Sequence, residues 1–505
     1  MLFPLFKNVG ISAVGFFAIS VVSLLLVPVT IAAYGLTGLG LIAICRLFLP
    51  TATLAVLDFG VGEYATQSVA VARVSFEHGR CGGQLAIALS AAVVSGTLGG
   101  LALFFASAYL SRWLSVPPSE QETFSTVIRI TALVLPVLFA SQVFEGVIKG
   151  FENFAAQRIC EVAVSLAYAA MVLGVTSLGW GFESVCYALL VSLLLRTCIA
   201  FAFAWWSLRG WTLQLLEWQT RDRADFMVRA RLMFSNKALG TAQTQLAPAL
   251  IAALLGVTAV GVFDALTKLP RFAKSVLGLL TSTVLPVAAK LESASDNKNM
   301  RRLGETGVLI VGLLVLPPLA AAMVFSKSIL EIWLSGALTH YWHWQAAMFL
   351  IPALSVIVGF GAAALIVRPL ATSAMNRLVF FQVALQFGLS LALINFIQER
   401  AFILGQVLAV VITFIWQMRL LALELNTSAN AYWRLMRIAL ICMAMVLPGL
   451  FIQRWVVGPA TLGVAIMLWA SGAWLACFAG VLDREQRARL YTFAIAKMAS
   501  FSAKH

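Results

Sequence analysis

The sequence is poor in charged residues, and acids are especially scarce. Only 11% of its 505 residues are Asp, Glu, Lys or Arg, whereas 61% are apolar and the mean hydropathy is +0.94. A soluble globular domain has about 25% charged residues, so this composition excludes a water-soluble globule. No polar stretch is long enough to form a separate soluble domain, which also excludes a protein with only one or two membrane anchors.

Cysteine and histidine are scarce as well. The seven cysteines mostly lie within apolar runs, where they are expected as small core residues rather than disulfide partners. Two of the four histidines, His340 and His343, share one connector, and we interpret them as residues of the membrane interface. There is no nucleotide-binding loop and no nucleophile–base pair, so the sequence predicts no metal site, no cofactor and no enzymatic activity.

Apolar segments of spanning length dominate what is present. A transmembrane helix needs about 20 apolar residues, and in lipid each such segment must be helical because its backbone polar groups need internal partners. The sequence therefore predicts an all-α polytopic membrane protein with about fourteen transmembrane helices. The expected segments are 9–34, 39–60, 85–110, 124–148, 159–178, 185–206, 235–256, 261–289, 305–325, 344–367, 378–397, 402–418, 435–453 and 460–480.

The basic residues indicate the orientation of these segments. With the N-terminus placed in the cytoplasm, 23 of the 35 Lys and Arg residues fall in inner connectors or tails and 4 in outer connectors. This bias predicts a bacterial inner-membrane protein with both termini in the cytoplasm. It also accounts for the net charge of +14 without nucleic acid, because basic loops hold helices against an anionic inner leaflet.

The domain organisation follows from the longest inner connector. We predict an N-terminal six-helix lobe (1–206), a basic amphipathic linker on the inner leaflet (207–234), a second six-helix lobe (235–421), two appended helices (422–480) and a basic cytoplasmic tail (481–505). The linker interleaves Trp211, Leu215, Leu216, Trp218 and Phe226 with five arginines.

Five basic residues are predicted deep within these segments. A charge near the bilayer centre costs about 2.5–3.5 kcal/mol on insertion scales, so such residues usually have a function. The spacing of the three on the eighth segment places them within an arc of about 120° on one helix face. We expect this face to line an aqueous cavity that accepts an anion. The five candidates are Arg46, Arg196, Lys268, Arg271 and Lys274.

Two other interpretations of these bases stay open. The first is a structural salt-bridge network, in which Asp264 pairs with Lys268 one turn later. The second starts the eighth segment later, so that 264–274 becomes an outer loop, which would contradict the charge bias. Pro270 and Pro286 are expected to bend the eighth segment, as in transporters that alternate between two open forms.

Several short motifs resemble the Wzx-type polysaccharide flippases of the multidrug/oligosaccharidyl-lipid/polysaccharide exporter superfamily. Each motif is short and degenerate, and the resemblance covers nearly the whole chain through the order of the segments and the sizes of the loops. The motifs are Lys7-Asn8, Tyr34-Gly35-Leu36, Leu57-Asp58-Phe59-Gly60-Val61-Gly62, the stretch from Gly146 to Gln157, Val260-Gly261-Val262-Phe263, Pro286 and Ile329-Leu330-Glu331-Ile332-Trp333-Leu334.

The resemblance implies two pseudo-symmetric six-helix lobes around a V-shaped cavity. It implies alternating-access transport of an undecaprenyl-diphosphate-linked oligosaccharide, such as an O-antigen, capsule or exopolysaccharide repeat unit, to the periplasmic leaflet. Related flippases carry basic residues on the second and eighth helices, where Arg46 and Arg271 lie here. The implied partners are the lipid-linked oligosaccharide, membrane lipid, and the polysaccharide polymerase and chain-length machinery.

Alternative functions within the same superfamily are a lipid II flippase of peptidoglycan synthesis and a cation-coupled multidrug exporter. Fourteen segments fit both flippase branches, and the stretch from Leu57 to Gly62 favours the polysaccharide branch. The first and seventh segments contain no Asp or Glu, whereas cation-coupled drug exporters usually place a carboxylate there. A basic cavity would also repel organic cations.

Overall fold

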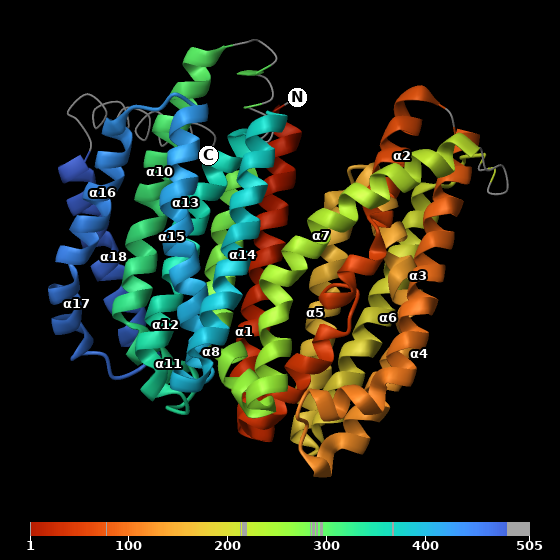
Figure 1. The fold of residues 1–505 in the computed structure, drawn as a ribbon, viewed down its shortest axis with the longest axis horizontal. Coiled ribbons are helices and arrows are strands. Elements are labelled where there is room, and N and C mark those ends of the chain that lie inside the picture. Colours follow the sequence, from red (N-terminus) through yellow and green to blue (C-terminus); the bar gives the residue numbers. More distant parts are fainter. Residues whose placement is uncertain are drawn as a thin grey trace, which may run out of the picture. The chain divides into compact units, whose positions relative to one another are not determined.

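The computed structural model consists of helices joined by turns and short connectors in the part of the chain that it describes, which comprises residues 2–76, 78–212, 214, 220–282, 284, 288, 291–292, 296–365 and 368–481 (Figure 1). No strand is found in these ranges, so the predicted all-α class is confirmed. The first group of helices is α1 (Leu2–Leu47), α2 (Val61–Ser75), α3 (His78–Trp113), α4 (Gln121–Gly150), α5 (Phe154–Ser177), α6 (Phe182–Ser207), α7 (Thr220–Leu255) and α8 (Val257–Ser282), with 3₁₀ turns η1 (Thr53–Asp58) and η2 (Pro118–Glu120). The second group is α10 (Asn297–Val324), α11 (Ser326–Trp333), α12 (Trp342–Met348), α13 (Leu350–Leu365), α14 (Pro369–Ile397), α15 (Arg400–Glu424), α16 (Ala429–Ala444), α17 (Val446–Gln453) and α18 (Pro459–Val481), with the turn η3 (Thr339–Tyr341).

Twelve of these helices or helix pairs within the described residues are long and apolar enough to cross a membrane. The chain is therefore a multi-pass membrane protein. The two expected segments that do not meet this standard on their own are the second (39–60) and the eighth (261–289). Each differs from an uninterrupted apolar helix for an identifiable reason.

The second segment is divided between several short elements. Its beginning continues α1 beyond a kink at Gly35, whose φ of 65° is a left-handed conformation that favours glycine. Its remainder forms η1, and the chain then turns through Phe59 (φ 49°) and Gly60 (φ 76°) into α2. Pro50 stands where α1 has ended. The apolar run is therefore present, but it does not form one continuous helix.

The eighth segment forms α8. Its charged residues explain why it is not apolar enough to count as a membrane span. Asp264, Lys268, Arg271 and Lys274 all lie within this one helix. The helix continues through Pro270, which is buried. The second proline, Pro286, and the end of the predicted segment lie outside the described residues.

The chain divides into two compact units, Met1–Lys268 with Leu391–Phe402, and Leu269–Ser390 with Ile403–His505. In the first unit, α4 packs against α2, α3 and α6, and α1 packs against α5. Phe124 and Phe139 of α4 are fully buried. This packing makes α4 the central helix of the unit.

In the second unit, α10 packs against α13, α16 and α18. Its buried side chains form one cluster with those of α13 and α16. The C-terminal helices are fixed by Trp469, whose indole N–H donates to the Met445 carbonyl at 2.8 Å. The two last predicted spans correspond to α16 with α17, and to α18.

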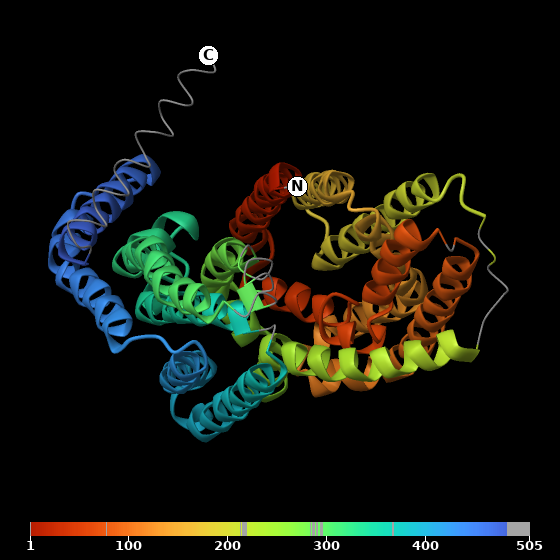
Figure 2. The same ribbon diagram turned by 90° about the horizontal axis from the view of Figure 1, so that it is seen from above.

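The predicted linker 207–234 is partly built into α7, which begins at Thr220 and continues to Leu255. Viewed from above, α7 runs beside the helices of the first unit (Figure 2). Phe226, expected to face lipid, is buried, and its ring lies 5.1 Å from that of Tyr64 on α2. Leu215, Leu216 and Trp218, and the predicted tail from residue 482 onward, lie outside the described residues. The lobe boundaries and the leaflet position of the linker stay predictions.

Candidate functional site

A cavity of about 230 Å³ lies within the first unit, between α1, α5, α6 and α8. Both halves of the kinked α1 contribute to it, from Ile19 to Thr30 before the kink and from Leu39 to Arg46 after it. Seven of its thirteen lining side chains are apolar and six are polar. The polar side chains that line it are Ser23, Thr30, Arg46, Ser165, Tyr168 and Lys268.

Two glycines allow α8 to reach this wall. A Cβ atom on Gly40 would lie 2.1 Å from the Val257 carbonyl oxygen, and one on Gly261 would lie 2.0 Å from that of Leu36. Only glycine therefore permits α1 and α8 to cross this closely. The crossing explains the local sequence Val260-Gly261-Val262-Phe263 and lets both helices border the same cavity.

Arg46 is oriented by Tyr168. Its Nη2 donates to the Tyr168 hydroxyl at 2.9 Å, and its guanidinium carbon lies 5.9 Å from the centre of the same ring. The hydrogen bond and the cation–π contact together hold the planar guanidinium at the cavity wall. A guanidinium presents several N–H donors in one plane, which suits bidentate recognition of a phosphate.

Lys268 supplies the second positive charge. Its Nζ lies 3.2 Å from Oδ2 of Asp264 one turn earlier, as the sequence suggested. Asp264 is buried and also interacts electrostatically with Arg46. Among the described contacts of this cavity, two half-buried bases meet one acid at this end of α8, and an excess of positive charge within a membrane favours binding of an anion.

Arg196 lies in a different part of the unit. Its Nε is 2.7 Å from Oε1 of Glu145 on α4, and its Nη2 is 3.8 Å from Oε1 of Glu161 on α5. It does not belong to the wall of the Arg46 cavity. This geometry fits the salt-bridge interpretation of Arg196, because the Glu145 carboxylate neutralises its charge.

Arg271 and Lys274 belong to the second unit and are exposed. They follow Lys268 at intervals of three residues on α8, as predicted from the helical period. Arg46 and Lys268 are therefore the two predicted residues that the structure brings to one cavity. The roles of Arg271 and Lys274 stay predictions.

Sequence reasoning missed Tyr168 and its neighbour Ser165 on α5. The available signal was the spacing of these two hydroxyls, three residues apart in the middle of the segment, which places both on one helix face. Lys237 is a further basic residue outside the predicted set. Lys237 Nζ lies 2.5 Å from Asp58 and 3.1 Å from Glu63, and so connects α7 to the stretch from Leu57 to Gly62.

The glycines of the same stretch are explained by close packing. A Cβ atom on Gly146 of α4 would lie 2.3 Å from the Gly62 carbonyl oxygen, so α2 and α4 meet backbone to backbone. Gly60 adopts a left-handed conformation and donates its N–H to Oδ1 of Asp58 at 2.6 Å. These motif residues shape the first unit and do not line the cavity.

The family described as "Polysaccharide biosynthesis protein" matches residues 37–343, which is more than half of the chain. No curated protein matches the sequence.

Several solved transporter structures have a similar fold. The lipid II flippase MurJ in an inward closed conformation superposes with a TM-score of 0.67 at 13% identity, over 92% of this chain and 97% of that one. An inward-facing multidrug resistance MATE family transporter of the MOP superfamily gives 0.62 at 14% identity, over 82% and 99%. The Vibrio cholerae MATE transporter VcmN in its bent form gives 0.56 at 13% identity, over 83% and 97%. At these identities the comparison concerns the fold alone.

Proposed function

Because the chain belongs to the polysaccharide biosynthesis protein family, we propose that it is a flippase for an undecaprenyl-diphosphate-linked oligosaccharide. It would move an O-antigen, capsule or exopolysaccharide repeat unit from the cytoplasmic to the periplasmic leaflet of the bacterial inner membrane by alternating access. Both termini would lie in the cytoplasm. The observation that carries the proposal is the surplus positive charge of Arg46 and Lys268 at one cavity.

The diphosphate is the part of this substrate that lipid solvates least. Its negative charges need donors within the membrane, and Arg46 and Lys268 supply them while Asp264 limits the excess. Tyr168 holds the guanidinium of Arg46 in place before substrate arrives, which reduces the entropic cost of binding. The polyprenyl tail can stay in lipid, so only the head group needs a polar route.

A lipid II flippase is the second candidate, and the similarity of fold to MurJ favours it. Lipid II presents the same diphosphate, so the cavity charge does not distinguish the two substrates. The family match favours the polysaccharide substrate, because its description concerns polysaccharide synthesis. Consumption of the product in the outer leaflet would then fall to the polysaccharide polymerase and chain-length machinery. No chemical step is assigned to this chain.

The test is leaflet-resolved transport in proteoliposomes. Purified protein is reconstituted with a fluorescent undecaprenyl-diphosphate-linked oligosaccharide, and its appearance in the other leaflet is followed with a membrane-impermeant glycosidase. Parallel vesicles contain lipid II or a cationic dye. We expect transport of the lipid-linked oligosaccharide and its loss in Arg46→Gln.

Arg129→Gln is the matched control, because Arg129 also lies within a spanning helix but donates to Ser107 at 3.1 Å, away from the cavity. Transport of lipid II alone would replace the proposed substrate with the second candidate. Transport of the cationic dye alone would refute both flippase functions.

A further inference from the structure

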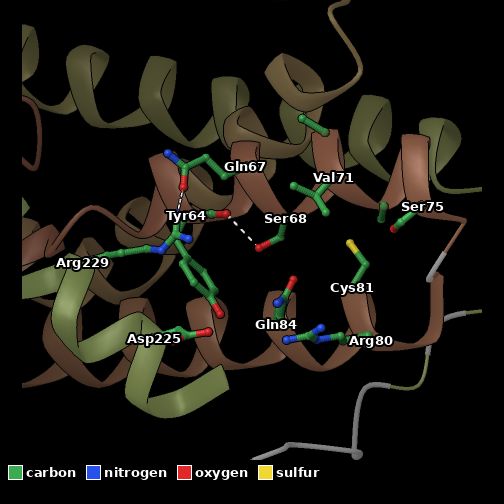
Figure 3. Close-up of a pocket in the computed structure, with 12 residues that line it drawn as sticks. Tyr64, Gln67, Ser68, Val71, Ser75, Arg80, Cys81, Gln84, Asp225 and Arg229 are labelled. Atoms are coloured by element: carbon green, nitrogen blue, oxygen red, sulfur yellow. Dashed lines mark hydrogen bonds between the residues drawn. The ribbon is translucent and has the colours of Figure 1, made fainter. Parts of the chain in front are cut away.

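A second and larger cavity, of about 390 Å³, lies in the first unit between α2, α3 and the beginning of α7 (Figure 3). Its volume falls within the range of about 300–1,000 Å³ that is typical of ligand sites. None of its lining residues belongs to the Arg46 cavity. Neither the proposed flipping mechanism nor the motif residues account for its polar side chains.

The position of α7 is fixed by one buried carboxylate beside this pocket. Asp222 has a side chain that is only 1% exposed, and its Oδ1 accepts hydrogen bonds from Arg80 Nε at 3.2 Å, Arg80 Nη2 at 3.0 Å and Gln84 Nε2 at 3.1 Å. The charge of Arg80 is thereby neutralised. Asp225 and Arg229 follow on the same face of α7 at helical spacing and therefore project into the pocket (Figure 3).

Asp225 and Arg229 bring opposite charges into one pocket. Arg229 Nη1 donates to the side-chain oxygen of Gln67 on α2. Asp225 is exposed to the pocket, and the described residues contain no hydrogen-bond partner for its carboxylate. Although the two residues are one turn apart, they form no ion pair with each other in the described structure. Each charge therefore keeps bonding capacity for a ligand.

The rest of the lining suits a ligand with both polar and apolar parts. Burial and the charge of Asp222 raise the pKa of Tyr64 to about 12, so its hydroxyl is neutral; it donates to the Asp222 backbone carbonyl at 3.4 Å and can accept a hydrogen bond from a ligand. Val71 lines the pocket and is 63% exposed, and Val74 further along α2 is 81% exposed. These two valines give the pocket an exposed apolar edge, which suits the acyl chains of a lipid, and the arginines around it favour the cytoplasmic side.

We propose that this pocket binds the zwitterionic head group of an aminophospholipid, of the phosphatidylethanolamine type. Arg229 binds the phosphate, the Asp225 carboxylate accepts hydrogen bonds from the primary ammonium group, and the acyl chains lie along Val71 and Val74. A choline head group has no N–H donor for Asp225, and an anionic glycerol head group brings no positive charge to it. The pocket should therefore select the primary amine.

The experiment is native mass spectrometry of the full-length protein in detergent, titrated with equal amounts of phosphatidylethanolamine, phosphatidylcholine and phosphatidylglycerol. We expect the wild-type protein to retain phosphatidylethanolamine at least about 10-fold more tightly than the other two, since a charge-assisted hydrogen bond contributes about 1.5–3 kcal/mol. Arg229→Gln should weaken phosphatidylethanolamine binding about 10-fold. Asp225→Asn should abolish the preference over phosphatidylcholine.

Arg231→Gln is the matched control, because Arg231 is exposed on α7 but does not line the pocket. Equal retention of the three lipids by wild type, or unchanged binding in Arg229→Gln and Asp225→Asn, would overturn the proposal. So would preferential binding of phosphatidylglycerol, or displacement of bound lipid by a prenyl diphosphate. None of these outcomes bears on Arg46, so this proposal can fail while the flippase function stands.

Discussion

The ion pair between Arg196 and Glu145 allows the two interpretations of Arg196 to be separated by measurement. Replacing Arg196 with Met removes the charge and leaves Glu145, whose side chain is 8% exposed, without its partner at 2.7 Å. Removing one partner of a buried pair costs about 3–5 kcal/mol. Because the Arg196 side chain is 25% exposed, we expect the low end of this range, about 3 kcal/mol.

Replacing the acidic partner, Glu145, should cost less stability. In Glu145→Gln, Arg196 keeps Glu161 at 3.8 Å and its access to solvent, so a loss of only about 1 kcal/mol is expected. The double variant removes both charges, and its loss should fall below the sum of the single losses by about 1–3 kcal/mol. Arg129→Met is the control for replacing an arginine within a spanning helix.

The assay is unfolding by sodium dodecyl sulfate in mixed micelles, which yields a free energy of unfolding for each variant. Transport is measured on the same preparations. If Arg196→Met unfolds like the wild type yet loses transport, the structural interpretation is refuted. Arg196 would then be assigned to the substrate site, as the sequence predicted.

Two further predictions concern the cavity and the helix packing. Tyr168→Phe removes the hydrogen bond to Arg46 but keeps the ring. It should raise the apparent KM for lipid-linked substrate about 2- to 12-fold without loss of expression. An unchanged KM would show that Tyr168 does not position Arg46. Gly146→Ala places a methyl group 2.3 Å from the Gly62 carbonyl oxygen and should abolish the monodisperse peak in size-exclusion chromatography. Gly174→Ala is the control, because no atom lies within 4 Å of the added methyl group, and it should keep the peak. Equal profiles for the two variants would contradict the close packing of α2 and α4.

The fold class could be predicted from hydropathy and charge bias. Lipid requires spanning segments to be apolar and helical, and basic loops prefer the inner side of the membrane. Most expected segments correspond to apolar helices, and the basic side of α8 was visible from its three-residue spacing. The broken second segment was not foreseen, because an apolar run does not reveal where the backbone leaves the helix. The left-handed residues Phe59 and Gly60 decide this locally.

The candidate site was only partly predictable. A helix period places Lys268 on a face of α8, but it cannot show which acids from other helices meet a given base. Glu145 and Arg196 are 51 residues apart, and only tertiary packing brings them together. The contribution of α5 through Tyr168 was missed for the same reason, since the spacing of Ser165 and Tyr168 shows a shared helix face but not which base on another helix they meet.

The most direct test of the central claim is equilibrium binding of farnesyl diphosphate, a soluble prenyl diphosphate, to the purified protein by isothermal titration calorimetry. Loss of one charge-assisted contact should weaken binding about 10- to 100-fold in Arg46→Gln and in Lys268→Gln, while Arg129→Gln binds like the wild type. Wild-type affinity in both cavity variants would contradict the claim that these two bases receive the diphosphate.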